Sequence, residues 1–266
     1  MNIPILFEDD VMLVVNKPPG IVVNRAESVK GETVQDWVTS YLSFPRRRES
    51  ALSEGGSPIG SGMTWDHEKE FYDRAGIVHR IDKETSGILI IAKTVASFIE
   101  LQRQFKERII HKTYLAIVHG TLVPDVGEIR APVGRLPWNR ERFGIVPGGK
   151  ESVTKYRVIS VIPAQAGIRV SGRQIPDQAG DDKAFSVVEL YPESGRTHQI
   201  RVHLKYINHP ILGDYLYAGR KTARDDRTWA PRVMLHAWKL TCLHPKDGKT
   251  LAFEAPIPDD MRRIIK

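Results

Sequence analysis

The sequence contains one cysteine, Cys242, among its 266 residues. A single cysteine cannot form an internal disulfide and is typical of a reducing compartment, so we expect a cytoplasmic protein. The sequence also lacks an apolar run of about 20 residues, the length that a membrane helix requires. Residues 1–4 lead directly into a strand-like segment, with neither a basic start nor an apolar core. We therefore expect no signal peptide and no membrane partner.

Motifs for the commonest metal and hydrolase sites are missing as well. The nine histidines include no His-x-x-x-His pair, and one cysteine cannot make a Cys-x-x-Cys motif, so we expect no structural zinc. No serine stands in a Gly-x-Ser-x-Gly elbow. Residues 144–150 match the first part of a phosphate-binding loop, but Glu151 replaces the hydroxyl residue that binds magnesium, and a strand-like segment follows. We therefore reject that motif.

The chain carries an excess of positive charge. Lysine and arginine number 39 against 32 aspartates and glutamates, which gives a formal net charge of +7. This surplus favours an anionic partner, and nucleic acid is the simplest one. Many globular proteins are mildly basic, however, so the charge by itself does not assign a function.

Strand-like segments outnumber helical ones. Alternating or continuous apolar runs predict strands, and a hydroxyl residue before a helical period predicts a helix with its N-cap. Strands are expected at 3–15 (two strands), 21–23, 88–92, 112–118, 153–162, 185–191 and 234–243. Helices are expected from Thr33 to about Leu42, after the caps Thr94 and Thr197, and from Pro258 to Lys266. Many strands with few helices indicate an α+β fold with a largely antiparallel or mixed sheet.

Two stretches differ in composition from the rest. Residues 43–73 hold few apolar side chains, an arginine triplet and several glycines, so we interpret them as a long loop or insertion. Residues 163–184 contain most of a near repeat, in which 162–167 resembles 175–180. One pair of repeats is too short for a solenoid, so we interpret this stretch as an insertion in a hairpin.

The segment 77–93 concentrates polar side chains between buried ones. Residues 79–87 are dense in ionisable and hydroxyl groups, and the apolar run 88–92 predicts a strand buried on both faces. A polar loop held between buried segments can keep reactive groups rigid. Asp82 lies in this loop close to Arg80 and Lys83, whose charges favour the ionised carboxylate. Asp82 could act as a nucleophile, a base or a metal ligand, or it could simply hold the turn.

A second polar cluster covers residues 195–201. It lies across a turn and a predicted helix N-terminus, where free backbone N–H groups attract anions. Arg201 lies one helical turn beyond Thr197 and could pair with a carboxylate from another loop. Ordinary solvated arginines are the alternative interpretation.

These clusters together resemble a known family. Residues 79–87 closely resemble the signature of RluA-type pseudouridine synthases, and 195–203 with 210–214 resemble further segments of that family. Residues 17–20 and 112–114 are similar to two shorter family motifs. The motifs follow the family's order and span nearly the whole chain.

The resemblance implies a fold and a reaction. The expected fold is a bent, mainly antiparallel or mixed sheet with flanking helices around a central RNA-binding cleft. The expected reaction isomerises uridine in rRNA or tRNA to pseudouridine without a cofactor or a metal: the N1–C1′ bond breaks, the base turns, and C5 joins C1′. The implied partner is RNA, and we expect a monomer.

The resemblance also implies roles for individual residues. Asp82 would be the catalytic nucleophile, Arg201 would pair with it and keep it ionised, and Tyr114 would contact the target base and accept the proton at C5. Tyr114 could otherwise be a core tyrosine with its hydroxyl at the rim. Expected substrate contacts come from the same motifs: Lys17, His79, Arg80, Arg196, His198 and Ile200. Arg80 would stabilise the flipped-out base, and Ile200 would pack near it. Candidate phosphate contacts are basic residues elsewhere: Arg103, Lys106, Arg135, Arg140, Arg142, Arg220, Lys221 and Arg224.

The family pattern begins near residue 3, so we expect a single catalytic domain over 1–266 without a separate N-terminal RNA-binding domain. Two other functions stay open. One is a non-catalytic RNA-binding or RNA-folding protein that retains the fold. The other is an Asp-nucleophile phosphatase or metal-dependent hydrolase, which would need a second carboxylate cluster that Glu84 alone does not supply.

Overall fold

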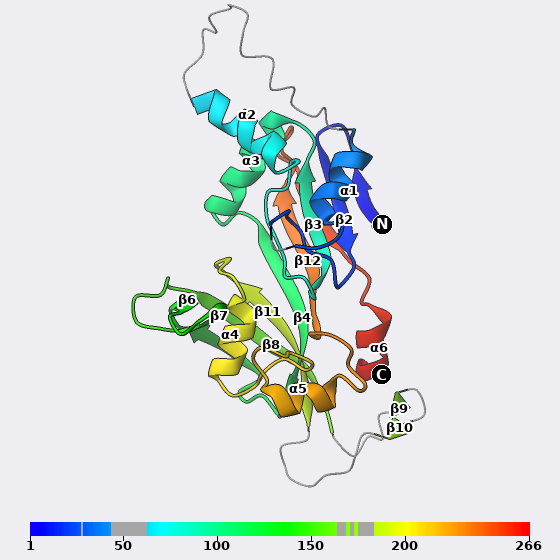
Figure 1. The fold of residues 1–266 in the computed structure, drawn as a ribbon, viewed down its shortest axis with the longest axis vertical. Helices are drawn as coiled ribbons and strands as arrows, with labels where there is room; N and C mark the ends of the chain where they lie inside the picture. The colour runs from blue at the N-terminus through cyan, green and yellow to red at the C-terminus, as the bar shows by residue number, and fades with distance from the viewer. Residues whose placement is uncertain (28, 44–62, 164–168, 171–172, 175–183) are drawn as a thin grey trace, which may run out of the picture. The chain divides into compact units, whose positions relative to one another are not determined.

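The computed structural model describes residues 1–27, 29–43, 63–163, 169–170, 173–174 and 184–266 (Figure 1). The chain divides into two compact units, each built from three segments. Unit 1 contains Met1–Lys83, Ile88–Ile110 and Cys242–Leu251, and unit 2 contains Glu84–Gly87, His111–Thr241 and Ala252–Lys266. Three of the boundaries between the units fall inside strands β3, β12 and β13, and the other two lie just before β3 and at the start of β4. The expectation of a single catalytic domain stays a prediction.

Unit 1 combines strands with three helices. Its elements are β1 (Ile5–Glu8), β2 (Met12–Lys17), α1 (Val34–Tyr41), α2 (Met63–Asp73), most of β3 (Ser86–Ala92) and α3 (Val95–Lys106). The two strands predicted within 3–15 are β1 and β2, which pair as an antiparallel hairpin, and the Asp9 carboxylate accepts the N–H groups of Val11 and Met12 at its turn. All seven residues of β3 are buried, which confirms the strand predicted from the apolar run.

The helices of unit 1 begin where the sequence predicts. Thr33 and Thr94 each accept a hydrogen bond from the third helical N–H and complete a capping box, with Asp36 and Ser97 respectively. Two other predictions are wrong. Residues 21–23 form no strand, because the carbonyls of Val22 and Val23 accept the first N–H groups of α1. The stretch predicted as a loop at 43–73 ends in α2, while 44–62 lie outside the described residues.

Unit 2 is organised on a largely antiparallel sheet. Its strands lie in the order β12, β4, β11, β8, β5, and every neighbouring pair in this series is antiparallel. Their bounds are β4 (His111–His119), β5 (Val126–Arg130), β8 (Val153–Ile162), β11 (Phe185–Pro192) and β12 (Leu235–Leu243). The first residues of β3 pair in parallel with β12, which makes the sheet mixed and confirms the predicted α+β class.

The remaining elements of unit 2 surround that sheet. They are β6 (Val133–Leu136), β7 (Asn139–Ile145), β9 (Arg169–Val170), β10 (Arg173–Gln174), α4 (Gln199–Tyr206), α5 (Arg220–Asp226), β13 (Thr250–Glu254) and α6 (Asp259–Ile265). The pair β9–β10 lies inside the predicted insertion 163–184, most of which is outside the described residues. Neither α5 nor β13 was predicted, since both are short and largely exposed. Side chains of β4, β11, α4 and α6 meet in one buried apolar cluster.

No helix in the described ranges has the length and apolarity to cross a bilayer.

Candidate functional site

The loop that carries Asp82 is supported in unit 1 by Lys17. This lysine is completely buried, and its Nζ donates to the carbonyls of Pro18, Ile21 and Lys83 at 2.9, 3.0 and 3.1 Å. The Gly20 N–H donates to the same Lys83 carbonyl at 2.8 Å. The ammonium therefore fixes the chain just after Asp82. The predicted contact of Lys17 with the substrate stays a prediction.

His79 supports the other end of this loop. Its Nε2 accepts the N–H of Ile90 at 2.9 Å, and its ring lies 4.7 Å from the Phe105 ring, centroid to centroid. Because a backbone N–H can only donate, Nε2 carries the lone pair and the neutral ring holds its proton on Nδ1. Arg80 is exposed and Asp82 is half-buried, so these two side chains reach solvent from a loop with fixed ends.

The chain enters unit 2 at Glu84, where two arginines hold it. Arg227 donates to the Glu84 carboxylate at 2.7 Å. The buried Arg232 donates from Nη1 to the carbonyl of Glu84, and its Nε and Nη2 bind both oxygens of Asp260 at 2.6 and 2.9 Å. This bidentate pair orients the guanidinium toward the backbone that follows Asp82.

The start of β3 is fixed next to these arginines. The Ser86 hydroxyl lies 2.9 Å from Nδ1 of His236, and both side chains are buried. Gly87 has φ +113°, and a Cβ on it would lie 2.2 Å from the Ala237 carbonyl oxygen. Only glycine fits where the β3 backbone comes this close to β12, which explains why a glycine follows Ser86 at the end of the polar loop.

Tyr114 lies on β4, between β11 and β12. It is opposite Leu190 on one side and Ala237 on the other, and it packs, partly buried, against the main apolar cluster of unit 2. The strand therefore fixes its backbone on both sides. This placement fits both interpretations of Tyr114, and the catalytic one stays a prediction.

Arg201 lies on α4 and forms a buried ion pair with Asp214. Its Nε and Nη2 donate to the two carboxylate oxygens of Asp214 at 2.7 and 2.8 Å, and the Asp214 side chain is fully buried. The guanidinium carbon lies 4.9 Å from the centre of the Tyr217 ring, a cation–π arrangement. Asp214 belongs to the motif at 210–214, but the sequence does not identify it as the partner of Arg201. The predicted pairing of Arg201 with Asp82 stays a prediction.

The backbone around Asp214 is itself fixed. Asp214 Oδ1 accepts the N–H groups of Leu216 and Tyr217, and the preceding N–H, of Gly213, donates to Asp226 at 2.9 Å. Gly213 has φ +74°, and a Cβ there would lie 2.1 Å from the Arg232 carbonyl oxygen. The motif at 210–214 thus forms a tight turn that presents a carboxylate to Arg201.

The turn before α4 differs from the prediction. His198, not Thr197, is the N-cap residue; it has left-handed φ of 56° and no capping side-chain bond. The Gln199 side chain fixes the turn before the helix instead. Its Oε1 accepts the N–H of Arg196, and its Nε2 donates to the Val153 carbonyl. Thr197 is exposed.

The predicted substrate contacts in this region differ in environment. The His198 Nδ1 lies 2.9 Å from the Tyr217 hydroxyl, which also accepts the Phe143 N–H at 3.1 Å. Arg196 is exposed, whereas Ile200 is buried in the main cluster of unit 2. Arg196 can reach solvent, and His198 is held by the aromatic residues around it.

The candidate phosphate contacts also differ. Arg103 pairs with Glu100 at 2.7 Å and with Glu107, so its charge is already balanced on α3. The side chain of Arg140 lies outside the described residues. Exposed candidates are Lys106, Arg135, Arg220, Lys221 and Arg224, and Arg142 is half-buried.

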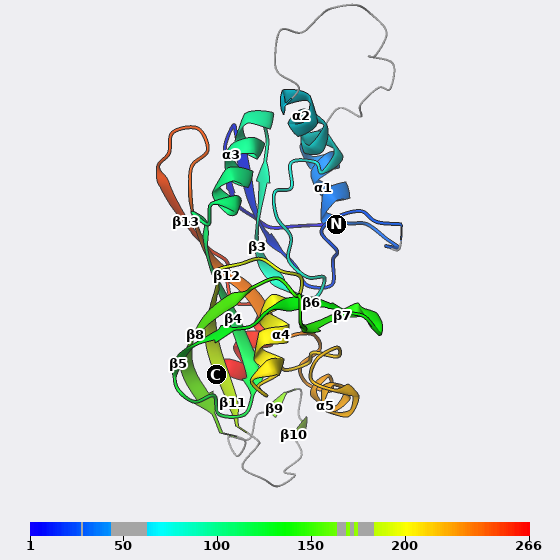
Figure 2. The same cartoon turned by 90° about the vertical axis from the view of Figure 1, so that its left-hand side faces the viewer.

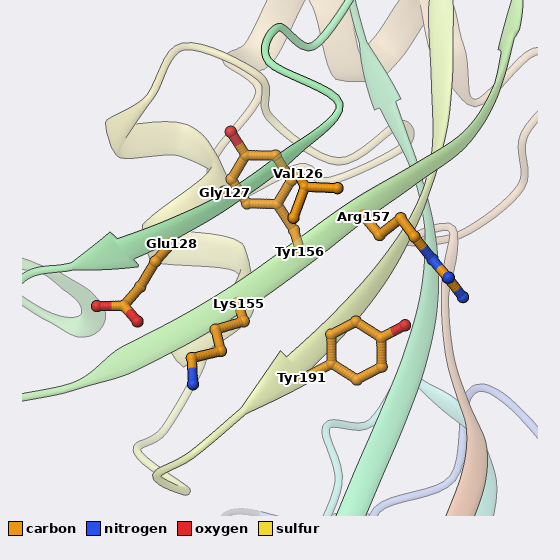
Figure 3. A pocket seen from close by; sticks show the side chains of 7 residues that line it. All are labelled: Val126, Gly127, Glu128, Lys155, Tyr156, Arg157 and Tyr191. Atoms are coloured by element: carbon orange, nitrogen blue, oxygen red, sulfur yellow. The ribbon is translucent and has the colours of Figure 1, made fainter.

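An open pocket lies on β5, β8 and the end of β11 (Figure 3). None of the predicted site residues lines it. Its charged side chains bind one another or neighbouring carboxylates, since Arg157 pairs with Glu189 and Lys155 pairs with Glu193. The pocket therefore offers little uncompensated charge to an anion. In the described part of the chain, no group of three His, Cys, Asp or Glu side chains could hold a metal ion.

Comparison with known proteins identifies the family. Residues 11–206 match the family model described as RNA pseudouridylate synthase. The chain is 36% identical over 98% of its length to ribosomal large subunit pseudouridine synthase D of Nitrosomonas europaea, of which it spans 64%. It is 35% identical over its full length to an uncharacterised RNA pseudouridine synthase of Bacillus subtilis, of which it spans 73%.

A solved structure supports the same assignment. Human RNA pseudouridylate synthase domain containing 1 aligns with a TM-score of 0.65 and 26% identity, over 96% of this chain and 83% of the human one. The resemblance seen in the sequence motifs is thus confirmed, and so is the mixed α+β fold. The chain belongs to the RNA pseudouridylate synthase family.

Proposed function

We propose that this protein is a monomeric RNA pseudouridine synthase that isomerises uridine in large-subunit ribosomal RNA. The observation that carries the proposal is the family match over residues 11–206, which includes Asp82, Tyr114 and Arg201. The choice of ribosomal RNA rests on the name of the relative from Nitrosomonas europaea. A cytoplasmic location is part of the proposal, since the one cysteine is free and buried.

The chemistry needs a nucleophile on a rigid support. Asp82 attacks the target nucleotide, the N1–C1′ bond breaks, and the base turns so that C5 bonds to C1′. The proton on C5 is then lost to a base, and N1 gains one. Tyr114 contacts the base and accepts the C5 proton, while Arg201 keeps Asp82 ionised. The bonds from Lys17 and Arg232 support this role, because they fix the carbonyls of Lys83 and Glu84, the two residues that follow Asp82.

Access to the base requires that the RNA be opened. A uridine inside a folded RNA must leave its stack before Asp82 can reach it, and this costs a few kcal/mol. Arg80 is an exposed cation two residues before Asp82, and it stabilises the opened strand. The net charge of +7 favours association with the phosphate backbone.

The direct test is release of tritium from RNA that carries uridine labelled at C5. Wild-type protein should release tritium from large-subunit ribosomal RNA and not from bulk tRNA. Asp82→Asn should lower the rate by at least about 1,000-fold while it binds RNA as the wild type does. Asp10→Asn is the matched control, since Asp10 is an exposed carboxylate in the same unit, and it should be fully active.

The outcomes separate catalysis from binding alone. A wild-type protein that binds RNA but releases no tritium would instead be a non-catalytic RNA-binding member of the family. Release that persists in Asp82→Asn would show that another residue is the nucleophile.

A further inference from the structure

An exposed tryptophan lies at the tip of the hairpin formed by β6 and β7. The last residue of β6, Leu136, pairs with the first residue of β7, Asn139, so only Pro137 and Trp138 form the turn. Trp138 is 79% exposed, the most exposed of the large hydrophobic side chains in the described part of the chain. Figures 1 and 2 both draw the hairpin beside α4, with its tip extending away from the sheet of unit 2.

The base of the hairpin is held firmly against α4. Phe143 on β7 donates its N–H to the Tyr217 hydroxyl and makes an edge contact with the His198 ring at 5.7 Å. Val133, Val202 and Tyr217 form a separate small apolar cluster, against which Phe143 packs. A two-residue turn on such a base has little freedom, so Trp138 loses little entropy when a partner binds it.

The hairpin is basic. The segment 133–150 contains four basic residues and one acidic residue, Glu141, which gives 4 − 1 = +3. The basic residues are Arg135, Arg140, Arg142 and Lys150. Arg135 lies on β6 with its guanidinium carbon 5.1 Å from the centre of the Phe143 ring, and its side chain is exposed. The tip therefore combines an aromatic face with cations a few residues away.

We propose that Trp138 stacks on an unpaired base of the RNA substrate, while Arg135 contacts the adjoining phosphates. The inference rests on the proposed function only in taking RNA as the partner. An exposed indole next to cations matches single-stranded nucleic acid, because every base has a face for stacking and every nucleotide carries a charge. A single exposed apolar side chain needs no explanation by itself, so the argument depends on the rigid turn and the surrounding charge together.

The experiment measures RNA affinity of three variants. The probe is an RNA stem-loop whose target uridine lies in the loop, and the reference is a fully paired duplex of the same stem sequence. Trp138→Ala should weaken stem-loop binding about 5- to 150-fold and leave duplex binding unchanged, since stacking contributes about 1–3 kcal/mol per base. Trp138→Phe, which keeps an aromatic face, should bind within about threefold of wild type. Tyr206→Ala removes another exposed aromatic side chain, on α4, and should bind the stem-loop as the wild type does.

Several results would overturn the inference. These are stem-loop affinity of Trp138→Ala within twofold of wild type, equal loss for stem-loop and duplex, or a Trp138→Phe variant as weak as Trp138→Ala. Circular dichroism of each variant checks that the fold is intact, which the exposure of Trp138 leads us to expect.

This test is independent of catalysis. If the wild type releases no tritium but its stem-loop binding depends on an aromatic residue at 138, the proposed function fails and the inference stands. If the wild type is active and Trp138→Ala binds normally, only the inference fails.

Discussion

The ion pair between Arg201 and Asp214 allows a sharp prediction about stability. Asp214 is fully buried, and its carboxylate accepts two guanidinium N–H groups and two backbone N–H groups. In Asp214→Asn, Oδ1 can still accept the backbone bonds, but an amide NH₂ now faces the Nε–H of Arg201. The substitution therefore removes a negative charge from beside a buried cation and opposes two donors. Removing one partner of such a pair costs about 3–5 kcal/mol.

Two further variants identify charge as the cause. The double variant Arg201→Met with Asp214→Asn removes both charges but keeps the side-chain oxygen that accepts the N–H groups of Leu216 and Tyr217, so it should recover much of the lost stability. Glu128→Gln is the exposed control. It breaks an ion pair in which the Glu128 side chain is 35% exposed and the Arg130 side chain is 65% exposed, and it should cost less than about 1 kcal/mol of stability.

Urea unfolding and hydrogen exchange together measure the effect. Because the chain forms two compact units, a single unfolding transition need not report unit 2. Hydrogen exchange of the α4 amide protons reports unit 2 directly. In Asp214→Asn, the free energy of opening of α4 should fall by the same amount, about 3–5 kcal/mol. A loss below about 1 kcal/mol in Asp214→Asn, on both measurements, would refute the reasoning from burial and geometry.

The remaining predictions concern the start of β3. Burial lowers the pKa of His236 from 6.5 to about 4, so the unfolded chain binds a proton at this residue at a higher pH than the folded one. Stability should be complete above pH 6.5 and fall as the pH drops toward 4, by on the order of 3 kcal/mol, and urea midpoints across this range should flatten in His236→Gln. Gly87→Ala should cost about 3 kcal/mol more than Gly31→Ala in thermal unfolding, because both glycines have φ above +100° but only Gly87 faces a carbonyl within 2.2 Å of the new Cβ. Equal costs would show that backbone strain, not the contact with Ala237, decides the effect.

Local signals in the sequence located some elements well. Thr33 and Thr94 were identified as caps because a hydroxyl residue precedes a helical period, and both form the expected capping boxes. Thr197 shows the same signal but is exposed, because Gln199 satisfies the turn through bonds to Arg196 and Val153. A glutamine that reaches back to the turn competes with a hydroxyl cap, and a single-residue rule does not weigh the two.

The candidate site, too, could be predicted from the sequence only in part. The resemblance identified the motifs, but it could not assign a partner to each charge, since partners come from distant segments. Asp214 was quoted in one motif and Arg201 in another, yet only the structure shows that the two side chains pair. Lys17 is completely buried against backbone carbonyls. An isolated lysine gives no sign in the sequence that it is buried, because its charge normally keeps it at the surface.

Several polar residues in and near these motifs thus hold the chain around residues 79–90 in place. His79, Lys17, Arg232 and His236 each bind backbone or a neighbouring hydroxyl around 79–87, and none of them needs to touch RNA to be required. Burying these polar side chains costs desolvation energy. Their hydrogen bonds offset that cost and hold the loop at 79–87 in one conformation. Substitutions at these positions should therefore lower the reaction rate through the position of Asp82, whereas substitutions at exposed Arg80 or Trp138 should act first on RNA binding. Separate measurement of RNA affinity and of tritium release distinguishes the two groups.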